Sequence, residues 1–183
     1  GEIPTKEQVK WLTENWVRRA NVPEHVFRAI DALPVEAHPM TQLSVAVMAM
    51  QNTSVFAQRY SSGMNRSEYW DATYEDTMYL IARLPRVAAY IYRRVYFNGE
   101  QTLPDISLDW GGNFAHMLGI EDPGFKPYMR LFLTIHADHE GGNASAHTAH
   151  LVGSTLSDPY LSLSAAFNAL AGPLHGLANQ EVI

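Results

Sequence analysis

Apolar residues recur at intervals of three or four along most of the chain, which is the spacing of one face of an α-helix. Such positions run from Val9 to Val17, and Thr5 with Gln8 three residues later forms a capping-box pattern just before them. The period-two alternation of exposed strands is almost absent. The pattern therefore predicts an all-α fold made of many helices.

Glycine and proline residues mark the expected ends of these helices. A proline inside a helix removes a hydrogen bond, and so Pro85 predicts the end of one helix and the start of another. Asp158 and Pro159 supply an N-cap followed by a proline at the first helical position. The predicted helices cover residues 5–20, 23–33, 39–50, 53–61, 70–83, 85–97, 109–118, 123–139, 145–157 and 159–171.

Composition narrows the classes of partner. With 183 residues, 46% of them hydrophobic, the chain can bury a core of ordinary size. A net charge of −6 without a stripe of basic residues argues against nucleic acid as a partner. The absence of cysteine excludes a disulfide framework, and no apolar run approaches the roughly 18 residues that a membrane span needs. Gly1 is not an initiator methionine, and Ile183 ends a helical pattern, so we expect that both ends are cut.

Four of the eight histidines lie within the segment 134–150, at His136, His139, His147 and His150. Histidines three apart share a face of a helix. Gly141 and Gly142 should interrupt the helix between the two pairs. We expect Ser145 to cap the helix that follows, and His139 and Asn143 to meet at the corner.

These pairs permit a metal site, because two histidines three apart on a helix can chelate zinc or iron. No cysteine or inward Glu-x-x-His pattern completes such a ligand set. A non-catalytic helical interaction module is a further alternative, supported by the tyrosine and methionine content. Residues of these types at helical spacing are more often part of a core.

A fifth histidine, His175, lies between Pro173 and a helical pattern that begins at Leu177. Partial positive charge at a helix N-terminus favours a neutral imidazole, which can donate a hydrogen bond to a substrate oxygen that gains negative charge. A hydrogen-bonded structural histidine is the more common explanation of a lone residue in such a place. The residues alone leave both explanations open.

Two blocks of sequence resemble citrate synthase of the eukaryotic mitochondrial type. They are DHEGGNASAHTAHLVGSTLSDPYLS at 138–162 and AGPLHGLANQEV at 171–182. The resemblance continues upstream in HPMTQ (38–42), YWDATYEDTMYLIARLP (69–85) and LDWGGNFAHMLG (108–119). It covers nearly the whole chain. It implies a large helical domain over residues 1–174, with a hinge and the start of a small lid domain over 175–183.

The resemblance also implies an activity, the condensation of acetyl-CoA with oxaloacetate to citrate and CoA through an enol, in the mitochondrial matrix. No metal and no tightly bound cofactor are expected. His175 matches the histidine that binds the thioester oxygen, and His139 and Asn143 match residues that hold oxaloacetate. Ser145 is a candidate support that orients His175. The family's base aspartate, second histidine and arginines are expected outside this chain, so the chain alone should be inactive.

The sequence leaves open which acyl-CoA is the substrate and what the helix predicted at 145–157 packs against. Enzymes that condense propionyl-CoA to 2-methylcitrate share these blocks, and one methylene in a pocket is worth only ~1–3 kcal/mol. The helix predicted at 145–157 is rich in small residues such as Gly153. Close packing there could occur within the chain or between subunits, and the resemblance favours a homodimer.

Overall fold

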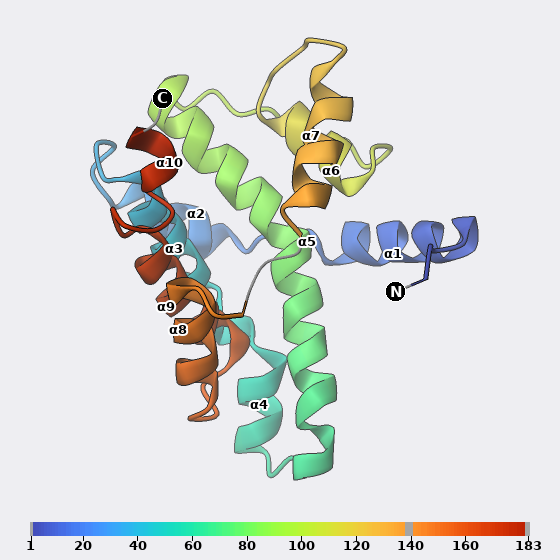
Figure 1. The fold of residues 1–183 in the computed structure, drawn as a ribbon, viewed down its shortest axis with the longest axis vertical. Helices are drawn as coiled ribbons and strands as arrows, with labels where there is room; N and C mark the ends of the chain where they lie inside the picture. Colours follow the sequence, from blue (N-terminus) through green and yellow to red (C-terminus); the bar gives the residue numbers. More distant parts are fainter. Residues whose placement is uncertain (1, 138–140, 182–183) are drawn as a thin grey trace. The chain divides into compact units, whose positions relative to one another are not determined.

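The computed structural model describes residues 2–137 and 141–181, except for the side chains at 179 and 181 (Figure 1). Over these residues every regular element is helical, which confirms the predicted all-α fold. None of the described helices is both long and apolar enough to cross a membrane. The elements are α1 (Lys6–Arg19), α2 (Glu24–Asp31), α3 (Pro39–Ala49), η1 (Gln51–Thr53), α4 (Val55–Ser61), η2 (Arg66–Glu68), α5 (Tyr69–Tyr96), α6 (Trp110–Met117), α7 (Phe125–Ile135), α8 (Ala144–Gly153), α9 (Pro159–Leu170) and α10 (Ala178–Glu181).

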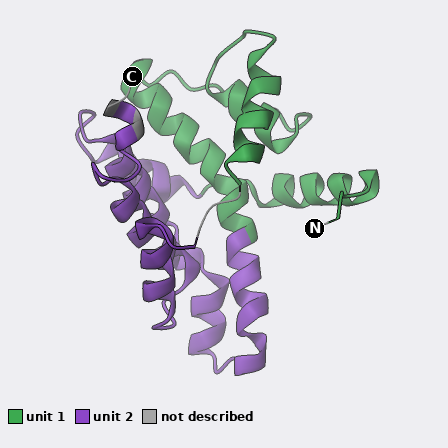
Figure 2. Cartoon of the chain, viewed as in Figure 1, with its two compact units in different colours: residues 1–22, 78–138 green, residues 23–77, 139–183 purple. Residues whose placement is uncertain are grey.

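The helices form two compact units (Figure 2). Unit 1 contains residues 1–22 and 78–138, and unit 2 contains residues 23–77 and 139–183. The long helix α5 contributes residues to both units. The predicted border between a large domain and a small domain, after residue 174, falls inside unit 2 and stays a prediction.

Two predicted helix starts are confirmed in atomic detail. The Thr5 backbone N–H donates to Gln8 Oε1 at 2.8 Å, and the Gln8 N–H donates to Thr5 Oγ1 at 3.2 Å, which completes the capping box of α1. At the start of α9, Asp158 Oδ1 accepts the backbone N–H groups of Tyr160 and Leu161. In both cases a side chain satisfies N–H groups that have no partner within the helix.

The prediction that Pro85 separates two helices is wrong, because α5 continues from Tyr69 to Tyr96 with Pro85 inside it. A proline cannot donate to the carbonyl four residues earlier, which here belongs to Ile81. The indole N–H of Trp110 donates to that oxygen instead, at 2.8 Å. A side chain from α6 thus supplies the hydrogen bond that the helix lacks, and this is a tertiary effect that local sequence does not contain.

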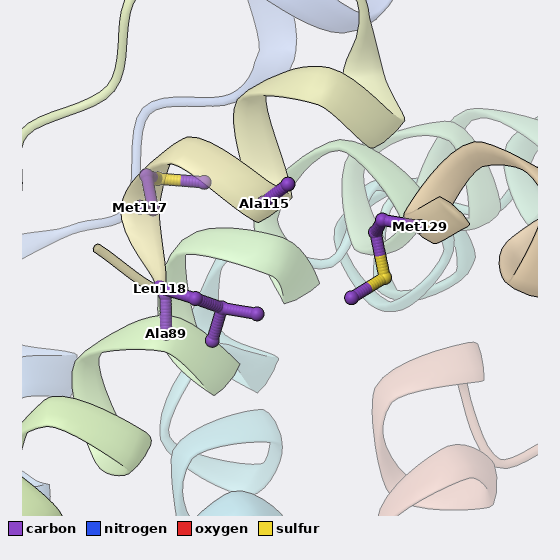
Figure 3. Packing of buried hydrophobic residues seen from close by; sticks show 5 residues of the cluster. All are labelled: Ala89, Ala115, Met117, Leu118 and Met129. Carbon is purple, nitrogen blue, oxygen red and sulfur yellow. The ribbon is translucent and has the colours of Figure 1, made fainter. Parts of the chain in front are cut away.

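Unit 1 has a core between α5, α6 and α7 (Figure 3). Its buried members are Ala89, Ala115, Met117, Leu118 and Met129. These side chains are small or unbranched at the β-carbon, so the three helices can approach closely. The buried area supplies the apolar stabilisation that holds α6 and α7 on α5.

In unit 1, an ion pair joins the start of α6 to the middle of α7. Arg130 on α7 donates from Nη2 to Asp109 Oδ2 at 2.6 Å and from Nε to both carboxylate oxygens. Asp109 is also the N-cap of α6 and accepts the Gly112 N–H at 3.0 Å. The hydrogen bonds from Arg130 hold the pKa of the Asp109 carboxyl below its usual range.

A buried polar seam joins α3 and α9 in unit 2. The Ser44 and Ser164 hydroxyls lie 2.9 Å apart, and the Ser164 hydroxyl also donates to the Ser44 carbonyl at 3.0 Å. The Ser44 hydroxyl is also within 2.9 Å of Asn168 Oδ1. Because both serines are buried, these bonds avoid the cost of unpaired hydroxyls and fix the position of α9.

A second buried polar contact in unit 2 holds the start of α4. The carboxylate of Asp76, on α5, accepts hydrogen bonds from the Ser54 hydroxyl at 2.7 Å and from the backbone N–H groups of Val55 and Phe56. Asp76 is fully buried, and this burial raises the pKa of its carboxyl. The Asp76 carboxylate on α5 therefore caps the N-terminus of α4, and the burial of this charge has an electrostatic cost.

Candidate functional site

The start of α8 differs from the prediction, because its N-cap is Asn143 and not Ser145. The Asn143 Oδ1 accepts the Ala146 backbone N–H at 2.9 Å and the Ser145 hydroxyl at 2.8 Å. Ser145 therefore lies inside the first turn, with its side chain available for a further contact. The helix also ends earlier than predicted, at Gly153 rather than at residue 157.

His175 lies in a tight turn over residues 172–177 that follows α9. Its backbone N–H donates to the Gly172 carbonyl at 2.9 Å, and the Gly176 N–H donates back to the Leu170 carbonyl at 2.9 Å. A β-carbon at position 176 would lie 2.5 Å from the same Leu170 oxygen, so only glycine fits there. The turn is thus anchored to the last residues of α9.

The structure brings His175 and Ser145 together across 30 positions of sequence. The His175 Nε2 lies 2.9 Å from the Ser145 Oγ and 3.4 Å from the Ser145 backbone nitrogen. Both contacts leave Nδ1 as the ring nitrogen through which His175 can bind another group. The ring is half-buried, a setting that suits a side chain that must meet a ligand.

The helical run that the sequence predicts from Leu177 is present as α10, which starts at Ala178 and has four residues. A second helix N-terminus, which the sequence did not predict, also lies beside His175. The first turn of α8 faces the imidazole through the backbone N–H of Ser145. The positive end of the α8 dipole is therefore next to the ring.

Of the other predicted site residues, Asn143 joins His175 through Ser145, whereas His139 lies outside the described residues. The predicted meeting of His139 with Asn143 therefore stays a prediction. His136 is not on a helix, since α7 ends at Ile135. The predicted functional roles of His175, Asn143 and Ser145 likewise stay predictions, which this arrangement of side chains supports.

The described residues contain no group of three or more histidine, cysteine, aspartate or glutamate side chains placed to hold a metal. His147 and His150 do lie on one helix, as their spacing predicts, and both are exposed. The His136 ring stacks on Phe132 with centroids 4.1 Å apart. Its Nδ1 lies 2.7 Å from the Phe132 carbonyl oxygen.

Two of the small residues of α8 lie against other parts of the chain. Ala146 is buried, and a β-carbon added at Gly153 would lie 3.6 Å from the Ser162 hydroxyl of α9. Gly153 therefore faces α9, and the predicted subunit interface along this helix stays a prediction. Leu151, on the same helix, is 62% exposed and leaves an apolar surface for a further contact.

Two features of this site were missed from the sequence. Asn143 and Ser145 are both good N-cap residues, so composition does not say which one caps α8. The steric need for glycine at position 176 depends on the return of the turn to Leu170, and no local pattern shows that. The juxtaposition of Gly172 and Gly176 around the histidine was the one available signal.

Fold and site together define an all-helical protein with a histidine held at the N-terminus of a helix. The family model for the citrate synthase C-terminal domain matches residues 1–183, and the chain belongs to that family.

The chain is 62% identical over 183 residues to a mitochondrial citrate synthase of Daucus carota, all of the chain being covered and 39% of that relative. Among solved structures, the citrate synthase of Pyrobaculum aerophilum matches with a TM-score of 0.84 and 34% identity, over 100% of this chain and 46% of that one. A ternary complex of carboxymethyl coenzyme A and oxaloacetate with citrate synthase from Thermoplasma acidophilum matches with a TM-score of 0.81 and 26% identity, over 99% and 45% of the two chains.

Proposed function

We propose that the protein containing this chain is a citrate synthase, which condenses acetyl-CoA with oxaloacetate to form citrate and CoA. The chain spans 39% of the length of its carrot relative, so the activity belongs to a larger protein. The hydrogen bond between His175 and Ser145 carries the proposal, because it orients an imidazole as a donor. The related ternary complex holds a coenzyme A derivative and oxaloacetate together, which supports these two substrates.

The proposed chemistry begins with loss of a proton from the methyl group of acetyl-CoA. Charge then develops on the thioester oxygen, and a donor already in place stabilises it most effectively. His175 is that donor, through Nδ1, while Ser145 holds Nε2. His139 and Asn143 hold oxaloacetate in this proposal. The base that takes the methyl proton comes from another part of the protein.

We further propose that this protein works in mitochondria and as a homodimer. The carrot relative is described as mitochondrial, which supports the location. The exposed Leu151 of α8 supports a contact with a second subunit on the side of the helix that does not face α9. Leu151→Asp should then yield monomers by light scattering, while Leu174→Asp, at a fully exposed position in the turn, should not. Dimers of unchanged stability in the Leu151 variant would exclude this interface.

The central test is His175→Gln in the intact protein, with release of the CoA thiol as the assay. Loss of the donor should lower kcat by roughly 10²–10³-fold. Calorimetry should show unchanged affinity for oxaloacetate. His147→Gln is the matched control, because His147 is an exposed histidine on α8 and should leave kcat unchanged.

Running the assay with acetyl-CoA and with propionyl-CoA distinguishes the two acyl substrates. A higher kcat/KM for acetyl-CoA is expected, and the opposite order would make the protein a 2-methylcitrate synthase. A kcat within threefold of the wild type for His175→Gln would remove His175 from the mechanism. An intact protein that turns over neither thioester would instead favour a non-catalytic helical module.

A further inference from the structure

Unit 1 contains a polar pocket between the C-terminal part of α5, the loop after α6 and the start of α7. This α5–α7 pocket encloses about 410 Å³, which lies within the range of small-molecule sites. Its charged and hydroxyl-bearing lining residues are Arg93, Thr102, His116, Glu121, Asp122 and Lys126. All of them belong to unit 1, whereas the candidate site around His175 belongs to unit 2. The pocket therefore needs an explanation of its own.

Arg93 brings a buried positive charge to the α5–α7 pocket, since the residue is only 8% exposed. Its Nη1 donates to the Leu118 carbonyl at 3.1 Å, and its Nε donates to the Glu100 carbonyl. Its Nη2 lies 3.9 Å from Glu100 Oε2, which is beyond hydrogen-bond distance, and has no closer acceptor among the described residues. An open edge of a guanidinium is a preferred partner for a phosphate or a carboxylate.

Two more cationic side chains line the same pocket. In the part of the chain that the structure describes, neither Lys126 nor His116 has an ion pair or a side-chain hydrogen bond. Their charges act on the neighbouring Asp105, whose carboxyl pKa is held below its usual range, mainly by hydrogen bonds from Ser107 and to a lesser degree by His116 and Lys126. The pocket thus has a side of positive potential.

Backbone geometry adds donors on this side. Helix α7 has no side-chain cap at its start, and the Lys126 backbone N–H has no acceptor within the described residues. Such an N–H at a helix start favours an anion. Gly119, with φ +78°, lies against Arg93 Nη1, where a β-carbon would collide with the guanidinium. The Thr102 hydroxyl lies close to the same place and is a further donor.

The opposite character comes from Glu121 and Asp122, which also line the pocket. The Asp122 Oδ1 accepts the Gly124 backbone N–H at 2.6 Å, and this bond fixes the carboxylate at the start of α7. An ionised carboxylate only accepts hydrogen bonds, so it suits ligand hydroxyl groups and repels a bare anion. The α5–α7 pocket therefore fits a ligand that carries an anionic group and hydroxyl groups together.

We propose that the α5–α7 pocket binds a small phosphate ester with free hydroxyl groups. Arg93 and Lys126 hold the phosphate, and Asp122 accepts hydrogen bonds from the hydroxyls. A phosphate held in this way joins α5 to α7 and stabilises unit 1 by mass action. The inference does not depend on the proposed condensation reaction.

The test is isothermal titration calorimetry of the intact protein with glycerol 3-phosphate and, separately, with inorganic phosphate. Saturating CoA and oxaloacetate are present throughout, so that sites for the substrates of the proposed reaction are filled. Lys126→Gln should raise the Kd for glycerol 3-phosphate roughly tenfold, because a charge-assisted hydrogen bond is lost. Lys6→Gln is the matched control, since it removes the same charge from an exposed position of unit 1 outside the pocket.

Asp122→Asn separates the two sides of the pocket, because an amide oxygen can still accept the Gly124 N–H. This variant should bind glycerol 3-phosphate more weakly and inorganic phosphate more tightly than the wild type. Arg93 is unsuitable for substitution, because its two hydrogen bonds to backbone carbonyls also hold the end of α5.

The wild type should bind glycerol 3-phosphate more tightly than inorganic phosphate. Equal affinity for the two would overturn the assigned role of Asp122. Absence of binding, or an unchanged Kd in Lys126→Gln, would overturn the site itself. Failure of the intact protein to make citrate would reject the proposed function and leave this comparison unaffected.

Discussion

The helix that contains Pro85 allows a sharp test of how much the hydrogen bond from Trp110 to the Ile81 carbonyl stabilises the fold. Trp110→Phe keeps an aromatic ring but removes the indole N–H that donates to the Ile81 carbonyl at 2.8 Å. An acceptor left unpaired costs about 1–3 kcal/mol. Weaker contact with the Trp16 ring, whose centroid is 5.6 Å away, adds ~0.5–1.5 kcal/mol. The total loss of unfolding free energy should be about 1.5–4.5 kcal/mol.

Only the first of these two costs depends on proline. In a Pro85→Ala background, the backbone N–H of the introduced alanine can donate to the Ile81 carbonyl, as in an ordinary helix. Trp110→Phe should then lose only the aromatic contribution. The coupling energy between Pro85 and Trp110 in a double-mutant cycle should accordingly be about 1–3 kcal/mol. Urea unfolding followed by circular dichroism measures it without relying on tryptophan fluorescence.

Trp16→Phe is the matched control for this cycle. Trp16 packs on the same ring, yet its Nε1 has no hydrogen-bond partner in the described part of the chain. Its removal should combine additively with Pro85→Ala. Additivity of Trp110→Phe with Pro85→Ala, to within ~0.5 kcal/mol, would refute the conclusion that Trp110 replaces the missing hydrogen bond.

Three further perturbations follow from the contacts described. Arg130 lowers the pKa of Asp109 below 3.8, so the pair stabilises the fold above that pH and loses this contribution as the pH falls through the folded-state pKa. Asp109→Asn should therefore flatten the acid limb of a curve of unfolding free energy against pH. An unchanged acid limb would contradict this. Asp76 has a raised pKa, so its contribution to the free energy of unfolding declines as the pH rises above 3.8. Asp76→Asn should still lose about 1–3 kcal/mol at neutral pH, because an amide cannot accept all three hydrogen bonds. Equal urea midpoints for the variant and the wild type would argue against the role of Asp76 in holding the start of α4. Gly153→Ala should raise the free energy of thermal unfolding by up to ~1 kcal/mol, since the added β-carbon would lie at an ordinary contact distance of 3.6 Å from Ser162. Gly153→Leu should lower it by about 1–3 kcal/mol, because the larger side chain does not fit against α9. The reverse order would show that the α8–α9 contact is misassigned.

Local sequence rules predicted the elements whose stabilising contacts are also local. The capping box at Thr5 and the cap at Asp158 involve residues within a single turn, and both are present. The prediction of a helix end at Pro85 failed for the opposite reason, because the indole N–H that makes a proline tolerable there comes from Trp110 on α6. The end of α7 at Ile135 was also placed too late, since apolar spacing alone does not locate a C-terminus.

The candidate site was reached mainly through resemblance, and the geometry explains why. His175 and Ser145 lie 30 positions apart, and no periodicity relates a turn after α9 to the first turn of α8. The choice of Asn143 over Ser145 as the N-cap depends on the same encounter, because Ser145 then contacts the histidine. Capping preference ranks these residues equally and cannot make that choice.

In the turn around His175, the neighbouring positions 175 and 176 should tolerate mutation differently. Within the described residues, nothing beyond the ring contact to Ser145 requires a histidine at 175, whereas a side chain at Gly176 collides with the Leu170 carbonyl. In a library of random variants, changes at position 175 should leave soluble protein and remove activity, while changes at position 176 should remove the protein itself. Over evolutionary time such a turn can exchange its reactive group and keep its shape, which makes it a reusable support for new chemistry.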